Sequence, residues 1–165
     1  MEIKVKLNGG ILPLKATIDD AAYDVYAPDD IELKYGRQVV DLKFSIELPH
    51  GHAAIIQPRS GFSCKGMQVQ AMIRKWWFML FGIFSKEKRV DADVLIGLVD
   101  EKYRNNVGAI IKSNFRPIFR KAIITRGTRI AQMRIVAVPE TELSEAEELD
   151  MTANRGGGFG HTGTK

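Results

Sequence analysis

The feature that most constrains the fold is an alternation of apolar and polar side chains with a period of two. Ile3, Val5 and Leu7 alternate with lysines, and residues 44–48 repeat the pattern before Pro49. This spacing places every second side chain on one face of a strand. Many short strands separated by turn residues predict an all-β sandwich or barrel. Further apolar or β-branched runs, separated by Gly, Pro, Asn and Asp, lie at residues 31–34, 39–42, 53–57, 107–111, 118–125 and 130–138.

Length and composition favour one globular domain with a core of its own. The chain has 165 residues, of which 45% are hydrophobic and 27% charged, a balance typical of soluble proteins. The net charge of +4 fits an anionic ligand such as a nucleotide. It is too small and too evenly spread to indicate a protein that binds nucleic acid.

The cysteine content and the apolar runs bear on location. Cys64 is the only cysteine, so no internal disulfide can form and a reducing compartment is expected. The N-terminal segment has no uninterrupted apolar stretch and does not resemble a signal peptide. The longest apolar run covers only residues 76–84, whereas a membrane-spanning helix needs roughly 20 residues. We therefore expect a cytoplasmic protein without a membrane span.

Residues 70–93 break the alternation and are interpreted as an insertion. Large apolar side chains, including Trp76 and Trp77, fill its first part, and the charged residues 85–89 follow. The favoured interpretation is an extra hairpin or helix that packs on the barrel or between subunits. A second interpretation makes residues 72–88 a docking surface for another protein or for a membrane, because basic residues flank the apolar run.

The C-terminal region changes character after the last predicted strand. Ser144 and Glu147 have the spacing of a capping box, so a short helix and an acidic turn are both open there. Residues 151–165 are rich in glycine and cannot build a core of their own. Because Phe159 has nothing local to pack on, this segment is predicted to be an arm that docks on a ligand. The expected organisation is a barrel domain over residues 1–150 and an arm over residues 151–165.

Five clusters along the chain carry polar groups suited to binding a nucleotide. Asp24 lies in an apolar, strand-like context, and a buried carboxylate there requires a cation or hydrogen-bond donors. Arg59 offers a guanidinium fork, and the Ser-Gly pair after it offers a hydroxyl and an accessible backbone. Asp100 and Tyr103 share a turn between two strands. The clusters occupy residues 21–27, 58–61, 97–104, 127–132 and 155–160.

Other polar residues favour structural explanations. Arg129 is expected to form a structural ion pair rather than to contact a ligand. His50 and His52 flank Gly51 in a turn and are expected to be surface residues. With three histidines and one cysteine in the chain, no zinc-binding pattern is visible.

Taken in order, the five clusters resemble those of the trimeric dUTP diphosphatase (dUTPase) family, over nearly the whole chain outside residues 70–93. The resemblance implies a jelly-roll-like β-barrel and a homotrimer with active sites shared between subunits. It implies Mg²⁺-dependent hydrolysis of dUTP to dUMP and pyrophosphate. It also implies that the C-terminal arm closes over the substrate in a neighbouring site.

The resemblance implies roles around the sugar and the base. Asp100 would activate the attacking water as general base and contact the sugar 3′-hydroxyl. Tyr103 would stack under the deoxyribose and leave no room for a 2′-hydroxyl. Leu98, Val99 and Gly108 would line the pocket, where backbone groups read the edge of uracil.

It also implies roles around the phosphates and in the arm. Arg59, Ser60 and Gly61 would hold the phosphate chain, and Gln132 would donate a hydrogen bond to a phosphate oxygen. Asp24 would support the metal region indirectly, through water. In the arm, Phe159 would stack over uracil and Arg155 would meet the terminal phosphate.

Three positions depart from the family pattern. Ala22 stands where Gly is frequent, Val94 where an Asn commonly reads uracil, and Asn154 where the arm has its Arg, so that Arg155 comes one place late. With Val94, uracil recognition would depend on backbone groups or on Asp93.

The alternative functions are a non-catalytic nucleotide-sensing regulator on the same scaffold and a dCTP deaminase. Pyrophosphate release, binding without turnover, and ammonia release distinguish the three.

Overall fold

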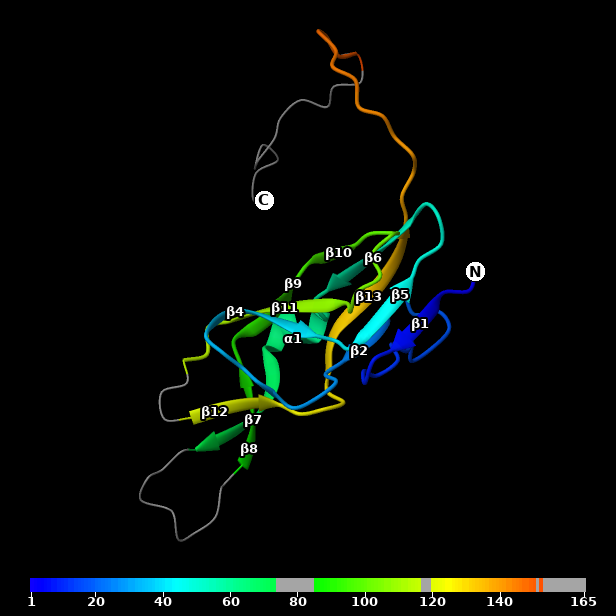
Figure 1. The fold of residues 1–165 in the computed structure, drawn as a ribbon. Helices are drawn as coiled ribbons and strands as arrows, with labels where there is room; N and C mark the ends of the chain where they lie inside the picture. The colour runs from blue at the N-terminus through cyan, green and yellow to red at the C-terminus, as the bar shows by residue number, and fades with distance from the viewer. Residues whose placement is uncertain (74–84, 117–119, 151, 153–165) are drawn as a thin grey trace.

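The structure is a computed structural model that describes residues 1–73, 85–116, 120–150 and 152. Within these residues the chain is almost entirely β-structure with one short helix, α1 (Figure 1). The first strands are β1 (Lys4–Leu7), β2 (Tyr23–Tyr26), β3 (Ile31–Glu32), β4 (Gly36–Asp41), β5 (Phe44–Glu47) and β6 (His52–Gln57). After α1 (Ser60–Lys65) follow β7 (Met67–Ile73), β8 (Ser85–Val90), β9 (Ala92–Leu95), β10 (Gly97–Val99), β11 (Gly108–Ser113), β12 (Arg120–Ile124) and β13 (Arg129–Ala137).

The strands form small sheets around a common core, and every strand pairing is antiparallel. The sheet orders are β1-β5, β10-β6-β13-β2, β4-β11-β9 and β3-β12-β7-β8. Strands far apart in sequence are neighbours, as when β13 lies between β6 and β2. The ends of β12, β7 and β8 project from one end of the barrel (Figure 1). This arrangement confirms the expected all-β, jelly-roll-like barrel.

The core collects the inward-facing residues of the alternating pattern. Along β5, Phe44 and Ile46 are buried whereas Glu47 is exposed. Along β11, Ala109 and Ile111 are fully buried. One contiguous cluster of such side chains draws on β2, β4, β5, β6, β7, β9, β10, β11, β12 and β13. The period-two pattern therefore specifies which face of each strand is removed from water.

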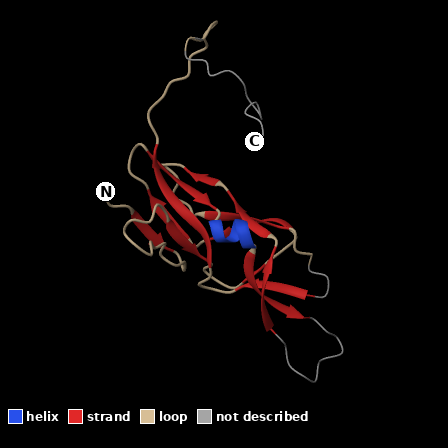
Figure 2. Ribbon diagram, turned by 180° about the vertical axis from the view of Figure 1, so that it is seen from behind, coloured by secondary structure: helices blue, strands red, loops and turns tan. Residues whose placement is uncertain are grey.

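The expected strands agree with the observed ones, whereas the helix α1 (Figure 2) was not expected. It begins at Ser60 and contributes Phe62 to the core. Of the two interpretations left open at residues 144–147, the helix is excluded, because residues 141–150 contain no helix. Leu143 and Leu149 in that stretch are exposed. A short helix without tertiary packing is not stable in water.

The insertion is shorter than residues 70–93. Residues 70–73 belong to β7 and residues 85–90 to β8, and these two strands form an antiparallel pair. Ala92 and Val94 are buried core residues of β9, which pairs with β11. The base of the segment is therefore a hairpin, as one interpretation expected. Residues 74–84, with both tryptophans, lie outside the described residues, and a docking surface over 72–88 stays a prediction.

Candidate active site

The first polar cluster is centred on the buried carboxylate of Asp24 in β2. Asp24 is 8% exposed as a whole residue. Its carboxylate accepts hydrogen bonds from two guanidinium groups. Arg59 Nε donates to Oδ1 at 3.0 Å, and Arg129 Nη1 donates to Oδ2 at 3.2 Å. These bonds offset the desolvation of the carboxylate. Two cations face one anion, so this edge of the sheet carries a net positive charge, and the expected structural ion pair of Arg129 is confirmed.

The loop after β6 presents its polar groups beside this pair. Arg59 is extended and precedes Ser60, the first residue of α1. The first backbone N–H groups of a helix have no intrahelical partner, so those of Ser60 and Gly61 are available to an anion. Gln132 on β13 pairs with Asp24 on β2 and with Gln57 at the end of β6. The side chains expected to bind phosphate thus come together at one edge of the barrel.

The second cluster lies on the connection from β10 to β11, at the tip of the hairpin that β9 forms with β11, while β10 itself pairs with β6. Val99 is buried and Leu98 is 65% exposed, so β10 presents Leu98 to solvent. The Tyr103 backbone N–H donates to the Asp100 carbonyl at 3.1 Å and closes the turn. The Tyr103 ring is 40% exposed, and its hydroxyl donates to the Asn106 carbonyl at 2.9 Å.

An open pocket of about 970 Å³ lies beside this hairpin. Tyr103 and Gly108 line it together with residues of β1, β4 and β5, including Lys4 and Lys6. An added Cβ at Gly108 would lie 3.2 Å from a methyl of Val39, so glycine keeps this wall open. Asp100 lines a neighbouring pocket of about 410 Å³. Tyr103, expected to contact the sugar, and Asp100, expected to act as base, thus lie on one turn but line different pockets.

Val94, which stands at the position of the expected uracil-reading side chain, does not face this pocket. It is 2% exposed, belongs to the core cluster and pairs with Ile111 in the sheet. The neighbouring Asp93 accepts a hydrogen bond from the Val94 backbone N–H at 2.8 Å. Reading of a base edge by backbone groups or by Asp93 stays a prediction.

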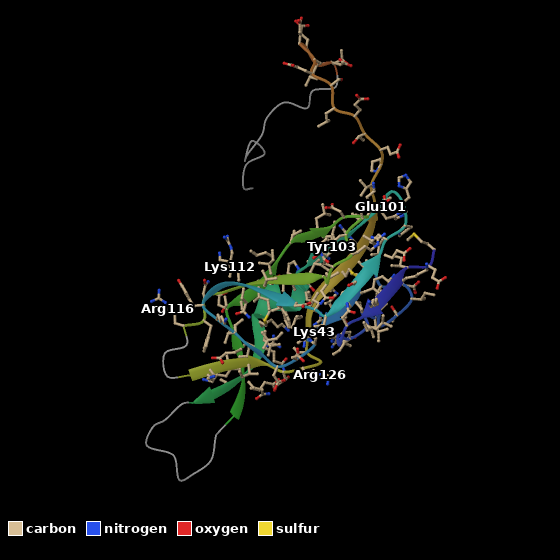
Figure 3. All side chains as sticks on the ribbon, in the orientation of Figure 1. Lys43, Glu101, Tyr103, Lys112, Arg116 and Arg126 are labelled. Carbon is tan, nitrogen blue, oxygen red and sulfur yellow. The ribbon has the colours of Figure 1, made fainter. Side chains whose placement is uncertain are left out.

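Sequence reasoning missed a contact that holds the Asp100 turn. Glu101 Oε2 accepts a hydrogen bond from the Gly51 backbone N–H at 2.8 Å and lies 3.1 Å from His50 Nδ1. These two interactions, the Gly51 bond first, lower the pKa of Glu101 below its usual value of 4.5. His50 Nε2 also lies 3.3 Å from Glu140, where the chain leaves β13. Figure 3 shows Glu101 at that end of the barrel.

The two clusters lie at opposite ends of β6 within one chain. Val99 pairs with Ala54, and Asp100 follows Val99 in the direction away from Arg59. The extended segment from Ala54 to Arg59 spans about 17 Å at about 3.3 Å per residue. Within one chain, the Asp100 turn and the loop at Arg59 are therefore separated by most of the length of β6.

The remaining expected site residues are Arg155 and Phe159, which lie outside the described residues. Within the ranges that are described, no three His, Cys, Asp or Glu side chains gather as a metal site. Both Asp24 oxygens contact arginines, so its support of a metal through water stays a prediction. No described helix has the length and apolar character required to cross a bilayer.

An antiparallel jelly-roll-like barrel with an arginine-rich edge and an aromatic hairpin pocket defines a protein that binds an anionic, ring-containing ligand. Comparison with known proteins specifies the family. The family described as dUTPase matches residues 9–83 and 79–163, two segments that meet within the insertion. The chain belongs to the dUTPase family.

Individual relatives match along nearly their full length. The deoxyuridine 5′-triphosphate nucleotidohydrolase of Gloeothece citriformis (strain PCC 7424) is 34% identical, with 99% of this chain and 97% of that protein covered. The enzyme of the same name from Paramecium bursaria Chlorella virus 1 is 30% identical, with 98% and 96% covered. The solved dUTPase of Staphylococcus bacteriophage 80alpha covers 99% of both chains with a TM-score of 0.74. At 22% identity, this last likeness shows the fold alone.

Proposed function

We propose that the protein is a dUTP diphosphatase, which hydrolyses dUTP to dUMP and pyrophosphate. Membership of the dUTPase family carries the reaction, and relatives matched over nearly the whole chain bear the name deoxyuridine 5′-triphosphate nucleotidohydrolase. The observation that supports the site is the division of polar residues into a phosphate-binding edge and a sugar-binding hairpin, each with the side chains that its task requires.

The hairpin binds the nucleoside. The ring of Tyr103 stacks under the deoxyribose and occupies the space that a 2′-hydroxyl would need, which excludes UTP by steric conflict. The exposed Leu98 side chain and the backbone of Val99 flank the base, because the Val99 side chain belongs to the core, and Gly108 keeps the facing wall open. Since the side chain of Val94 is in the core, backbone N–H and C=O groups of the hairpin form the donor and acceptor pattern that selects uracil over cytosine.

The loop after β6 binds the triphosphate. Arg59 neutralises phosphate charge while Asp24 fixes the direction of its guanidinium group. Ser60, Gly61 and Gln132 add neutral donors, which can follow the phosphate oxygens without adding charge. The net positive charge of this edge attracts the anion before contact.

The phosphate-binding residues would receive Mg²⁺ as part of the bound dUTP complex. Mg²⁺ prefers phosphate oxygens and keeps several waters, so the lack of a carboxylate cage in the described residues fits a metal carried by the substrate. Bound there, it withdraws charge from the phosphate chain. The phage phi11 dUTPase of S. aureus is described with a structural Mg(II) ion, and that of phage 80alpha was solved with dUpNHpp.

Asp100 acts as general base. Its carboxylate accepts a proton from a water molecule aligned with the α-phosphorus. The new P–O bond forms as the bond to the bridging oxygen breaks, and pyrophosphate leaves. Glu101 holds this turn against the Gly51 backbone, so the base is held by a contact that does not itself touch the substrate.

The separation of the clusters along β6 supports a site built from more than one chain. In a homotrimer, the hairpin of one subunit faces the phosphate-binding edge of another, and three equivalent sites result. The arm, with Phe159 over uracil and Arg155 near the terminal phosphate, would close such a site and exclude bulk water.

A nucleotide panel tests the proposal. Pyrophosphate release is measured with dUTP, UTP, dCTP and dTTP, with and without Mg²⁺, and ammonia release is followed for dCTP. We expect turnover of dUTP alone, and its loss when Mg²⁺ is chelated. Asp100→Asn should reduce kcat at least about 10²-fold, the lower range for losing a general base, whereas the exposed Asp19→Asn should be unchanged. Binding of dUTP by the unmodified protein without pyrophosphate release would contradict the proposal.

A further inference from the structure

A polar side-chain cluster lies beneath the turn that carries Tyr103. Its centre is Asn106, a half-buried residue at the end of the turn. Asn106 Oδ1 accepts hydrogen bonds from Asn8 Nδ2 at 2.7 Å and from Ser45 Oγ at 3.3 Å. Asn106 Nδ2 donates to Asp41 Oδ2 at 3.1 Å. One side chain thus connects the turn to β4, to β5 and to the end of β1.

Val107, which follows Asn106, is held in place by backbone hydrogen bonds. The Val107 backbone N–H donates to the Phe44 carbonyl at 2.8 Å, and the Val107 carbonyl accepts from the Leu42 backbone N–H at 2.9 Å. Val107 itself is fully buried. The end of the turn is therefore held from both sides, by backbone bonds at Val107 and by side-chain bonds at Asn106.

This fixed point reaches the Tyr103 ring directly. The backbone N–H of Tyr103 is bonded to Asp100 at one end of the residue, and its hydroxyl donates to the Asn106 carbonyl at the other. Tyr103 is 40% exposed and lines the pocket, so packing alone does not determine the tilt of its ring. A ring that must exclude one hydroxyl by steric conflict requires positional precision well below 1 Å.

We propose that Asn8 and Asn106 are positioning residues that set the tilt of the Tyr103 ring and so determine discrimination between deoxyribose and ribose. This inference rests on the proposed function, because it assumes that the sugar stacks on Tyr103. Asn8 directly follows β1, nearly a hundred residues earlier in the chain. The β1 strand pairs only with β5 among the described strands, and Asn8 links it to the turn.

The substitution that tests the inference best is at Asn8, whose side chain donates to Asn106 of the turn and to Ser45 of β5 at the wall of the pocket. Asn8→Ala removes the donor. Asn8→Asp keeps the shape but turns an oxygen toward Asn106 Oδ1, so it should have the same effect without a packing change. Tyr103→Phe keeps the ring and removes its bond to Asn106. The matched control is Asn114→Ala, at the opposite end of β11, which removes a side-chain bond to Asp91 of 2.6 Å.

The ratio of kcat/KM for UTP to kcat/KM for dUTP is measured for each variant, with melting temperatures to compare general stability. We expect the ratio to rise about tenfold, which corresponds to about 1.4 kcal/mol, in Asn8→Ala, Asn8→Asp and Tyr103→Phe. The rise should come mainly from a higher KM for dUTP and a gain with UTP. Asn114→Ala should leave the ratio unchanged even where its melting temperature falls equally.

Binding of dUpNHpp and of its ribose counterpart, measured by calorimetry, separates this inference from the proposed function. If the unmodified protein binds the analogues but does not turn over dUTP, hydrolysis is contradicted, and the binding ratio still tests the positioning role. A rise in the binding ratio parallel to the kinetic one supports the inference. Ratios that stay at the unmodified value in both Asn8 variants and in Tyr103→Phe would overturn it.

Discussion

Replacing Asp24 by Asn tests whether the buried carboxylate holds the phosphate-binding edge together. The substitution keeps the shape of the side chain and removes its charge. One oxygen can still accept from Arg59 or from Arg129, but the new amide N–H groups face the other guanidinium, donor against donor. The variant therefore loses one charge-assisted bond outright, weakens the second, and leaves two neighbouring cations without their anion.

The size of the effect follows from the exposure of each pair. The Arg59 side chain is 23% exposed and that of Asp24 is 11% exposed, so this bond has the strength of a charged hydrogen bond in a partly buried place, about 1.5–3 kcal/mol. The Arg129 side chain is 52% exposed, and solvent screens that pair to about 0–1 kcal/mol. Together they predict a loss of about 2–4 kcal/mol in the free energy of unfolding. A domain of this size would then melt roughly 10 °C lower.

The assay is urea unfolding followed by far-UV circular dichroism, at equal protein concentration because assembly would add to apparent stability. Asp29→Asn is the matched control, since Asp29 forms an exposed ion pair with Lys43. Its expected loss is below about 1 kcal/mol. The variant Asp24→Asn should also lose affinity for dUTP, because Arg59 is no longer oriented. Equal losses of stability in the two variants would refute the reasoning that burial makes the Asp24 cluster different.

Two further predictions concern backbone conformation and pH. Gly66 and Gly127 both have positive φ, so replacing Gly127 by Ala should cost roughly 1–2 kcal/mol of unfolding free energy. Gly66→Ala should cost clearly more, because its Cβ would lie 2.5 Å from the Val90 carbonyl oxygen, whereas Gly127 faces open space. Equal unfolding free energies would contradict the steric part of this argument. Because the pKa of Glu101 is lowered, its contribution to stability is fully present above its usual value of 4.5 and is lost as pH falls through the lowered value. The melting temperature should therefore decrease less steeply from neutral to acid pH for Glu101→Gln than for the unmodified protein. The same pH dependence of the melting temperature in both proteins would argue against the contact.

Much of the fold could be predicted from the sequence, because alternating apolar and polar residues place the apolar side chains on one face of a strand, which is the face that becomes buried. The runs around Phe44, Ala54 and Ala109 all became strands, and in the alternating run around Phe44 the apolar residues Phe44 and Ile46 are buried as expected. The helix α1 was not predictable from a local sequence signal, because its N-cap residue Arg59 makes no side-chain capping bond. The capping-box signal at Ser144 was misleading, because a local signal cannot replace an apolar face to bury.

The candidate site was accessible only in part. Each polar cluster could be recognised from residue types and order, including the pair of Asp100 and Tyr103. The contacts that fix these groups, such as Glu101 with Gly51 or Asn106 with Asn8, join residues about 50 and about 100 positions apart in the chain. No local pattern encodes such pairs, because they depend on which strands become neighbours.

The sequence by itself determined the class of fold, the family and the kinds of side chain that meet a nucleotide, because these depend on periodicity and on residue chemistry in fixed order. The tertiary structure decided the geometry. Antiparallel pairing of β10 with β6 sets the Asp100 turn and the Arg59 loop at opposite ends of one strand. This separation, a consequence of strand register that is absent from any single segment, is what supports the proposal of a site built from more than one chain.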